Sequence, residues 1–192
     1  DYFITTTTAH AAKVMSWLEE LLQTRWFNLK VHVASVSEQW TGIAVAGPYS
    51  RKVLEKNVRE ASQVSNEQLP FMGVIEVNLV GSVPCRIARI SFSGELAYEV
   101  YVPADFGPDV MDRLWSSAKE MGGCLYGLEA LGTMRIEKGH VTGAELDGRV
   151  TLEDAGLGRM ASTKKSFIGN ALRQRPELLR EDRPQLVGIF PK

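Results

Sequence analysis

The sequence predicts an α+β fold in which helices pack on a largely antiparallel sheet. Strand-like and helix-like segments interleave along the 192 residues, and three successive strand candidates in the middle of the chain are joined by short turns. Strands connected so tightly pair in antiparallel fashion, whereas parallel strands need long crossovers. A doubly wound nucleotide-binding fold would also need a glycine-rich turn between a strand and a helix, and the sequence contains no GxGxxG or Walker motif.

The first part of the chain predicts three strands and one helix. Residues 2–8 mix aromatic and β-branched side chains, which favours a strand. Residues 9–24 change to a helical period, with apolar side chains three and four positions apart. Residues 29–33 alternate apolar and polar side chains as a half-buried strand does. The short apolar run over residues 42–47 predicts a strand inside the fold.

A helix over residues 49–60 and a β-rich centre follow. Gly47 and Pro48 turn the chain, and Pro48 suits the first position of that helix because its missing N–H needs no partner there. β-Branched residues bounded by turn signals predict strands at residues 72–80, 84–92 and 96–102. The turns between these strands are expected at residues 81–82 and 93–95.

Two further helices are indicated over residues 108–121 and 126–138, where apolar side chains share one face. Gly122 and Gly139 follow them, as expected for glycines that adopt a left-handed C-terminal cap. Residues 139–162 are rich in glycine and acids, which predicts loops.

The C-terminal part of the chain predicts a boundary. A short helix is expected over residues 165–175, and strand-like residues follow a charged linker. We therefore expect one domain over residues 1–175, incomplete at its N-terminus, and a linker with the first strand of a missing barrel domain over residues 176–192. Because the chain lacks an initiator Met and both ends are strand-like, we expect a piece of a longer protein, truncated at both ends.

Composition argues against several classes of function. Lys and Arg number 22 and Asp and Glu 23, so the net charge of −1 shows no basic excess for nucleic acid. No apolar run approaches the roughly 18–20 residues of a membrane span. Cys85 and Cys124 lie far apart without a CxxC pair, which favours a reducing, cytoplasmic setting without disulfides. The three histidines are scattered, so no metal site is predicted.

The hairpin over residues 89–101 is the feature that suggests binding chemistry. If its turn is centred between Glu95 and Leu96, Phe92 faces Glu99 on one side of the sheet. A carboxylate beside an aromatic ring can hold a flat heterocycle, because it accepts two parallel hydrogen bonds while the ring stacks. A core Phe with a Glu at its rim would give the same pattern, and the residues alone leave both interpretations open.

Several motifs, in matching order over nearly the whole chain, resemble the aminomethyltransferase family, the T-protein of the glycine cleavage system. They are AVAGP at 44–48, SFSGELAYEVYV at 91–102, GLEALGTMRIEKG at 127–139, DAGLG at 154–158 and KKSFIG at 164–169. The resemblance implies the folate-binding fold of that family, with tetrahydrofolate as the bound cofactor.

Within the family, TTTTA at residues 5–9, SEQW at 37–40 and RIEKG at 135–139 are similar to the α subunits of heterotetrameric sarcosine oxidases. This resemblance implies that sarcosine is oxidised elsewhere in the complex and that its carbon is captured as 5,10-methylenetetrahydrofolate. Folate and the other oxidase subunits are the implied partners. Flavin and NAD would belong to the parent complex and not to this chain.

Individual residues match the family pattern unevenly. Glu99 matches the family glutamate that binds the N–H edge of the pterin, and Phe92 takes the position of a pterin-contacting tyrosine without its hydroxyl. Leu131 and Gly132 replace an arginine–aspartate pair whose arginine binds the folate tail, so recognition of the tail is expected to differ. Thr8 stands near a family asparagine and is a further departure.

No catalytic residue is assigned within the chain, because the family's catalytic aspartate precedes the matching segment. The fragment alone is therefore expected to be inactive. Arg135 and Glu137 are expected to form pairs at the end of their helix. The alternatives are a glycine cleavage aminomethyltransferase that acts with a lipoyl carrier protein, and a non-catalytic module for folate binding or subunit docking.

Overall fold

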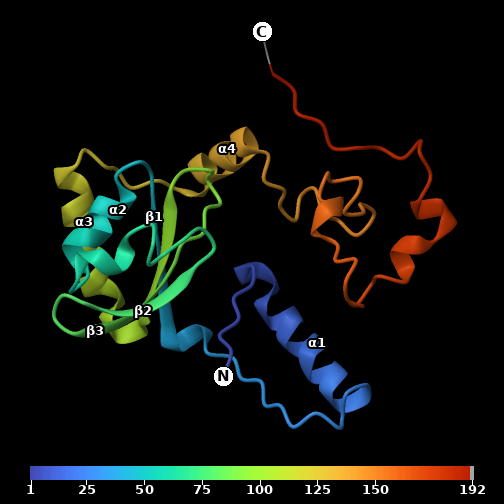
Figure 1. Ribbon diagram of the computed structural model, residues 1–192, viewed down its shortest axis with the longest axis horizontal. Helices are drawn as coiled ribbons and strands as arrows, with labels where there is room; N and C mark the ends of the chain where they lie inside the picture. The colour runs from blue at the N-terminus through green and yellow to red at the C-terminus, as the bar shows by residue number, and fades with distance from the viewer. Residues whose placement is uncertain (191–192) are drawn as a thin grey trace. The chain divides into compact units, whose positions relative to one another are not determined.

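The computed structural model describes residues 1–190 and contains a four-stranded antiparallel sheet together with helices (Figure 1). The strands are β1 (Trp40–Ala46), β2 (Val74–Leu79), β3 (Val83–Ala88) and β4 (Ala97–Pro103). Their order across the sheet is β1-β4-β3-β2, and the pairs β2–β3 and β3–β4 run antiparallel. The predicted α+β class is confirmed.

Four α-helices complete the regular structure, with short 3-10 turns between the elements. The helices are α1 (Ala11–Thr24), α2 (Ser50–Asn57), α3 (Gly107–Glu120) and α4 (Leu128–Lys138). Gly122 and Gly139 have the left-handed backbone expected after α3 and α4, with φ angles of 76° and 79°. Helix α2 begins later than predicted, because Tyr49 is its N-cap and Pro48 lies outside it. Within the described residues, no helix is both long and apolar enough to cross a bilayer.

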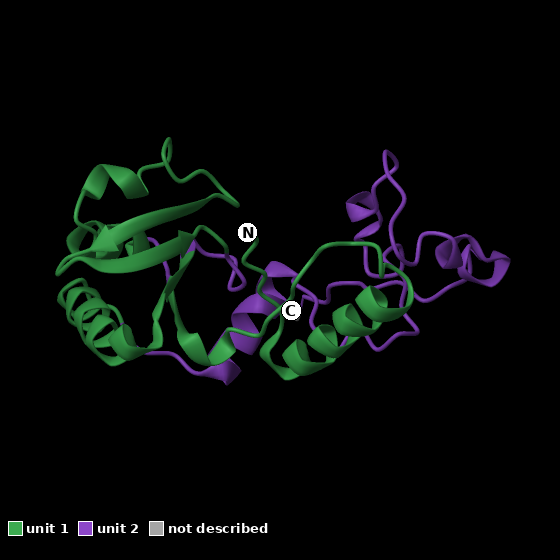
Figure 2. Cartoon of the chain, turned by 90° about the horizontal axis from the view of Figure 1, so that it is seen from below, with its two compact units in different colours: residues 1–45, 49–90, 98–123 green, residues 46–48, 91–97, 124–192 purple. Residues whose placement is uncertain are grey.

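The described chain forms two compact units (Figure 2). The first contains residues 1–45, 49–90 and 98–123, and so holds nearly all of the sheet with α1, α2 and α3. The second contains residues 46–48, 91–97 and the chain from residue 124 onward, including α4. The segment 91–97, which carries the predicted site residue Phe92, therefore belongs to the second unit.

The core of the first unit is built by alternate residues of the sheet together with buried side chains of α2 and α3. Its fully buried side chains include Leu54, Ile87, Tyr98, Val100, Val102 and Val110. In β4, residues 98, 100 and 102 are buried and residues 99, 101 and 103 are half-buried, because successive side chains of a strand point to opposite faces. Even the polar end of Tyr98 is satisfied, since its hydroxyl accepts a hydrogen bond from Arg51 Nε at 2.8 Å.

Helices α2 and α3 pack against each other within this unit. Asn57 lies at the end of α2 and donates from Nδ2 to Ser117 Oγ on α3 at 2.9 Å. The same Nδ2 donates to the Val53 carbonyl at 2.8 Å. A buried amide thus links the two helices without leaving its donors unpaired.

The connection between β2 and β3 is as tight as predicted, and the connection between β3 and β4 is not. Gly81 and Ser82 both have positive φ angles, 85° and 62°, as tight hairpin turns require. Strand β3, by contrast, ends at Ala88, and β4 begins at Ala97. Residues 89–96 form an irregular loop instead of a short turn.

The predicted pairing of Phe92 with Glu99 is therefore wrong. Glu99 lies opposite Ala88, and Tyr101 lies opposite Arg86. On the β2 side the pairing runs slightly beyond Ala88: Arg89 N–H donates to the Gly73 carbonyl at 2.9 Å, and the Arg89 carbonyl accepts from Met72 N–H at 3.1 Å. These bonds lie on the edge of β3 that faces β2 and do not occupy the edge that faces β4. On the β4 edge the ladder stops at the pair Ala88–Glu99, and the irregular loop beyond it carries Phe92 to His140, whose Nδ1 lies 2.9 Å from the Phe92 carbonyl.

Several predicted elements do not form in the described residues. Residues 2–7, 29–33 and 185–190 have no strand assignment, and most of their side chains are exposed. A strand needs a neighbour that satisfies its backbone, and alternation of side chains cannot supply one. The predicted helix over 165–175 is reduced to a 3-10 turn at Leu172–Gln174.

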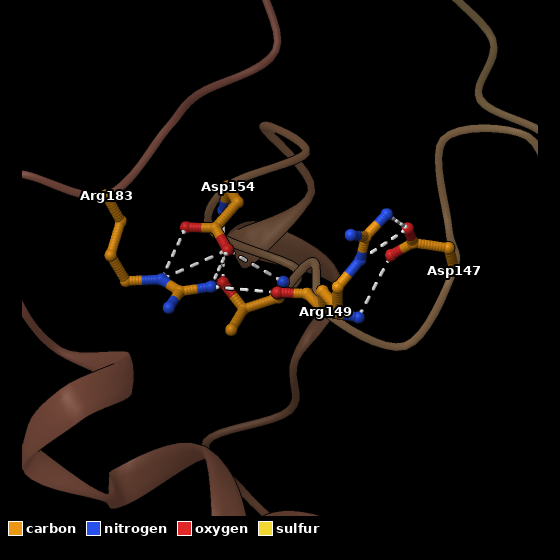
Figure 3. A network of polar contacts seen from close by, with 5 residues as sticks. Asp147, Arg149, Asp154 and Arg183 are labelled. Atoms are coloured by element: carbon orange, nitrogen blue, oxygen red, sulfur yellow. Dashed lines mark hydrogen bonds and ion pairs between the residues drawn. The ribbon is translucent and has the colours of Figure 1, made fainter.

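Polar interactions hold much of the second unit together. Asp154, only 7% exposed, binds the guanidinium of Arg183, with Nε at 3.0 Å from Oδ1, and accepts from Thr151 N–H at 2.9 Å (Figure 3). Arg183 Nη2 also donates to the Arg149 carbonyl at 3.0 Å, and Arg149 pairs with Asp147. This network joins residues far apart in the sequence, in a region with little regular structure.

We expect Leu54→Ala to lower the free energy of unfolding by about 2–5 kcal/mol, because it opens a cavity at a fully buried site of α2. Leu128→Ala on α4 is the matched control. Its side chain is 86% exposed, so a change below about 0.5 kcal/mol is expected. Urea denaturation followed by circular dichroism measures both. Equal losses in the two variants would contradict the assigned core.

The Arg183 guanidinium, followed by the Thr151 N–H, holds the pKa of Asp154 well below its usual range. Such a carboxyl stabilises the fold above its unfolded pKa of about 3.9, and the stabilisation is lost as the pH falls through the lower folded value. We therefore expect Asp154→Asn to lower the Tm at pH 7, and the difference from wild type to narrow below about pH 4. Glu177→Gln, at an exposed site of the same unit, should leave the Tm unchanged. A Tm difference for Asp154→Asn that is independent of pH would refute the assignment.

Candidate functional site

The two residues predicted to bind a heterocycle lie in different compact units. Glu99 is on β4 in the first unit, and Phe92 is in the segment 91–97 of the second. Each has its own set of neighbours.

Glu99 is half-buried on the face of β4 opposite to the core residues Tyr98 and Val100. Its Oε2 accepts a hydrogen bond from the hydroxyl of Tyr101, two positions along the strand. Among the residues that the structure describes, none donates a hydrogen bond to Oε1. The carboxylate is thus anchored through Oε2, while Oε1 has no hydrogen-bond donor among the described residues.

Tyr101 is itself held by an aromatic and cationic cluster. The Phe3 ring lies 5.7 Å from the Tyr101 ring in an edge-on arrangement and 5.4 Å from the Trp40 ring. The Arg86 guanidinium lies 4.9 Å from the Phe3 ring and 4.6 Å from the Trp40 ring, and its Nε donates to Glu76 at 2.9 Å. Cation–π contacts of this kind stabilise the cluster of Arg86 with the Phe3 and Trp40 rings. Burial and the neighbouring Glu99 raise the pKa of the Tyr101 phenol, so it stays protonated near neutral pH.

Phe92 is 40% exposed and is held by the end of helix α4. Its ring lies 5.9 Å from the His140 ring at an interplanar angle of 30°, and its carbonyl lies 2.9 Å from His140 Nδ1. Gly94, in the same loop, has a φ angle of 90°, and a Cβ there would come within 2.9 Å of Lys138 side-chain atoms. Only glycine therefore lets this loop approach the end of α4 so closely.

Arg135 secures the backbone that carries His140. Its Nη1 donates to the His140 carbonyl at 3.1 Å and to Glu145 Oε1 at 2.9 Å. Glu145 also accepts from Thr142 N–H at 2.6 Å, and that bond, together with Arg135, lowers the pKa of Glu145 to about 2. The predicted pairing of Arg135 near the end of its helix is confirmed, with Glu145 as its partner. The pairing predicted for Glu137 is wrong, because Glu137 is exposed and forms no ion pair with the residues that the structure describes.

Two residues that contact the predicted site residues, Tyr101 and His140, were not predicted from the sequence. Tyr101 could have been found, because residues i and i+2 of a strand share a face and Tyr101 follows Glu99 at that spacing. The pattern of three scattered histidines gives no reason to select His140. Its position directly after the Gly139 cap only weakly indicates a contact, and its contact with a loop about 50 residues away forms only in the tertiary fold.

The described residues contain no cluster of three metal-binding side chains, and Cys85 and Cys124 are both free thiols. Burial raises the pKa of the Cys85 thiol to about 12, so it is not an activated nucleophile. The two predicted residues are suited to binding a ligand. The Glu99 oxygen that lacks a donor among the described residues can accept an N–H group, and the exposed Phe92 ring offers a stacking surface.

Residues 1–165 match the model of the GCVT N-terminal domain. The sarcosine oxidase subunit alpha of Rhizobium meliloti (strain 1021) is 47% identical over 192 residues, which cover 99% of this chain and 19% of that protein. The subunit alpha of Corynebacterium sp. (strain U-96) is 41% identical over 191 residues, covering 99% of this chain and 20% of that protein. An aminomethyltransferase of Halothermothrix orenii is 33% identical over 144 residues, 74% of this chain and 39% of that protein.

The chain thus spans about a fifth of the length of the sarcosine oxidase subunits that it matches. The family resemblance inferred from the motifs is confirmed, and so is the likeness to sarcosine oxidase subunit alpha. With a match over most of its length, this chain belongs to the GCVT N-terminal domain family.

Proposed function

We propose that this chain is the tetrahydrofolate-binding region of a sarcosine oxidase α subunit. In the proposed role it holds the folate that captures the one-carbon unit from oxidised sarcosine, giving 5,10-methylenetetrahydrofolate. The other oxidase subunits would be its partners. Flavin and NAD would be bound by the parent complex outside this chain, in the cytoplasm.

The observation that carries the proposal is the half-buried Glu99 carboxylate, in which Oε2 is held by Tyr101 and Oε1 receives no hydrogen bond from the described residues. A reduced pterin presents neighbouring N–H donors along one edge of a flat ring. A carboxylate suits such an edge, because it accepts two hydrogen bonds in one plane, and bonds to a charged acceptor are stronger than neutral ones. The donor set of the ligand and the acceptor of the chain therefore fit each other.

Phe92 is proposed to contribute a stacking surface. Its ring is 40% exposed although the loop that carries it is held by His140 and Lys138. An aromatic ring that is exposed and yet fixed in position can stack on a flat ligand at little cost in side-chain entropy.

In this proposal the residues of the chain bind and orient, and none is assigned a proton-transfer step. Tetrahydrofolate, when bound, supplies the nitrogen atoms that take up the carbon. Correct placement by itself accelerates a reaction between two bound partners. The catalytic groups for the transfer would lie outside this chain.

Similarity favours an oxidase subunit over a free-standing aminomethyltransferase. Identity to the sarcosine oxidase subunits is 41–47% over 99% of the chain, compared with 33% over 74% for the aminomethyltransferase from Halothermothrix orenii. In helix α4, Leu131 and Gly132 replace the arginine–aspartate pair expected of a glycine cleavage enzyme. Neither residue can bind a carboxylate through its side chain, so the folate tail would be held by other residues.

We expect Glu99→Ala, introduced into the full-length protein, to weaken binding of a reduced folate by about 1–3 kcal/mol, because the variant leaves ligand donors without an acceptor. Isothermal titration calorimetry with 5-formyltetrahydrofolate measures the affinity. Glu55→Ala, at an exposed site of α2, is the control and should bind as wild type does. Unchanged affinity in Glu99→Ala would contradict the proposal that Glu99 binds the folate.

We expect Phe92→Ala to reduce the same affinity by about 1 kcal/mol through loss of stacking, with little change in Tm because the ring is already partly exposed. Phe106→Ala is closely matched, since Phe106 is 41% exposed in the other unit. It should leave folate affinity unchanged. If Phe92→Ala and Phe106→Ala weaken folate binding equally, the proposal that Phe92 stacks on the ligand is contradicted.

A further inference from the structure

We propose that Tyr101 is a positioning residue that orients the Glu99 carboxylate toward its ligand. The inference rests on the proposed function of Glu99 and extends it to a second residue, to which the sequence assigned no role. The chain of contacts that supports it lies within the first unit.

The first step is that the side chains of Glu99 and Tyr101 are aligned on the same face of β4. Glu99 and Tyr101 are neighbours on one face of β4, and the Tyr101 hydroxyl donates to Glu99 Oε2. A glutamate side chain has three rotatable bonds and would otherwise sample several directions in solvent. The hydroxyl selects one of these directions before any ligand arrives, and such preorganisation improves affinity.

The second step is that the hydroxyl always acts as the donor. Burial is the larger cause that raises the phenol pKa, and the Glu99 carboxylate adds to it. Around neutral pH the phenol therefore keeps its proton, and Glu99 remains the acceptor.

The third step is that the ring itself cannot turn away. Phe3 packs edge-on against it, and the Arg86 guanidinium lies over the rings of Phe3 and Trp40. Glu76 holds Arg86 in place from β2. The orientation of Glu99 is thus set by residues from the N-terminal segment and from all four strands.

The consequence concerns which ligands the site accepts. Tyr101 takes up one acceptor position on Oε2 and leaves Oε1 and the remaining lone pair of Oε2 for a ligand. Those positions suit two adjacent N–H donors on a neutral or cationic ring. An anionic edge would meet a fixed negative charge and be rejected.

The test is a double-mutant cycle in the full-length protein, with 5-formyltetrahydrofolate as the probe in calorimetry. We expect Tyr101→Phe, which keeps the ring, to weaken binding by about 3- to 10-fold. In a Glu99→Ala background the same change should add less than about 2-fold, because its effect passes through Glu99. Tyr49→Phe removes an exposed hydroxyl in the same unit and should have no effect.

A spectroscopic measurement separates positioning from packing. The infrared difference spectrum between Glu99→Gln and its parent contains the Glu99 carboxylate bands. These bands should shift when the Tyr101→Phe background replaces wild type, because a direct hydrogen bond is lost, and a purely structural role of Tyr101 would not move them. If Tyr101→Phe does not fold, Phe3→Leu provides a second route: it removes the edge-on ring contact that holds Tyr101, keeps the phenol and should weaken binding by about 2-fold.

The two proposals fail in distinguishable ways. Unchanged affinity in Glu99→Ala overturns the folate assignment itself. A loss in Glu99→Ala with wild-type affinity in Tyr101→Phe, or in Phe3→Leu if that variant is used, overturns the positioning role alone. An equal effect of Tyr101→Phe with and without Glu99 also overturns it, since the hydroxyl would then act by another route.

Discussion

The alternation of side chains along β4 is the constraint on which the first unit and its candidate site both depend. Tyr98, Val100 and Val102 point to one face and are fully buried, so the strand cannot shift by one residue without exposing them. The same register places Glu99 and Tyr101 together on the opposite face. Core packing therefore fixes where the carboxylate lies, although the carboxylate contributes nothing to the core.

The second unit is organised by a different kind of interaction. Its described residues form the single α-helix α4 and several 3-10 turns. The segments between them are tied by charged groups such as Asp154 with Arg183 and Arg135 with Glu145. Charge-assisted hydrogen bonds can link segments that bury little apolar surface, provided that the buried charges are paired. The loop that carries Phe92 lies against His140 after α4, where His140 Nδ1 is 2.9 Å from the Phe92 carbonyl.

Elements whose own residues supply a strong period were predicted well. The helices at 11–24, 107–120 and 128–138 and the strands at 40–46 and 74–79 all appear within a few residues of their expected positions. The predicted strands without a partner, at residues 2–7, 29–33 and 185–190, are absent from the described structure. Helices satisfy their backbone locally, whereas a strand depends on a neighbour that its own sequence does not specify.

By itself the sequence determined the fold class and the family, because these depend on local patterns and on motifs, and it named Glu99 and Phe92 as candidate binding residues. Only the tertiary structure decided how those residues are held. The β3–β4 ladder ends at the pair Ala88–Glu99, and the irregular loop beyond it carries Phe92 to His140, so Phe92 does not take the strand position opposite Glu99. Tyr101 and His140 gain their roles in the same way, from contacts that form only when the chain is folded.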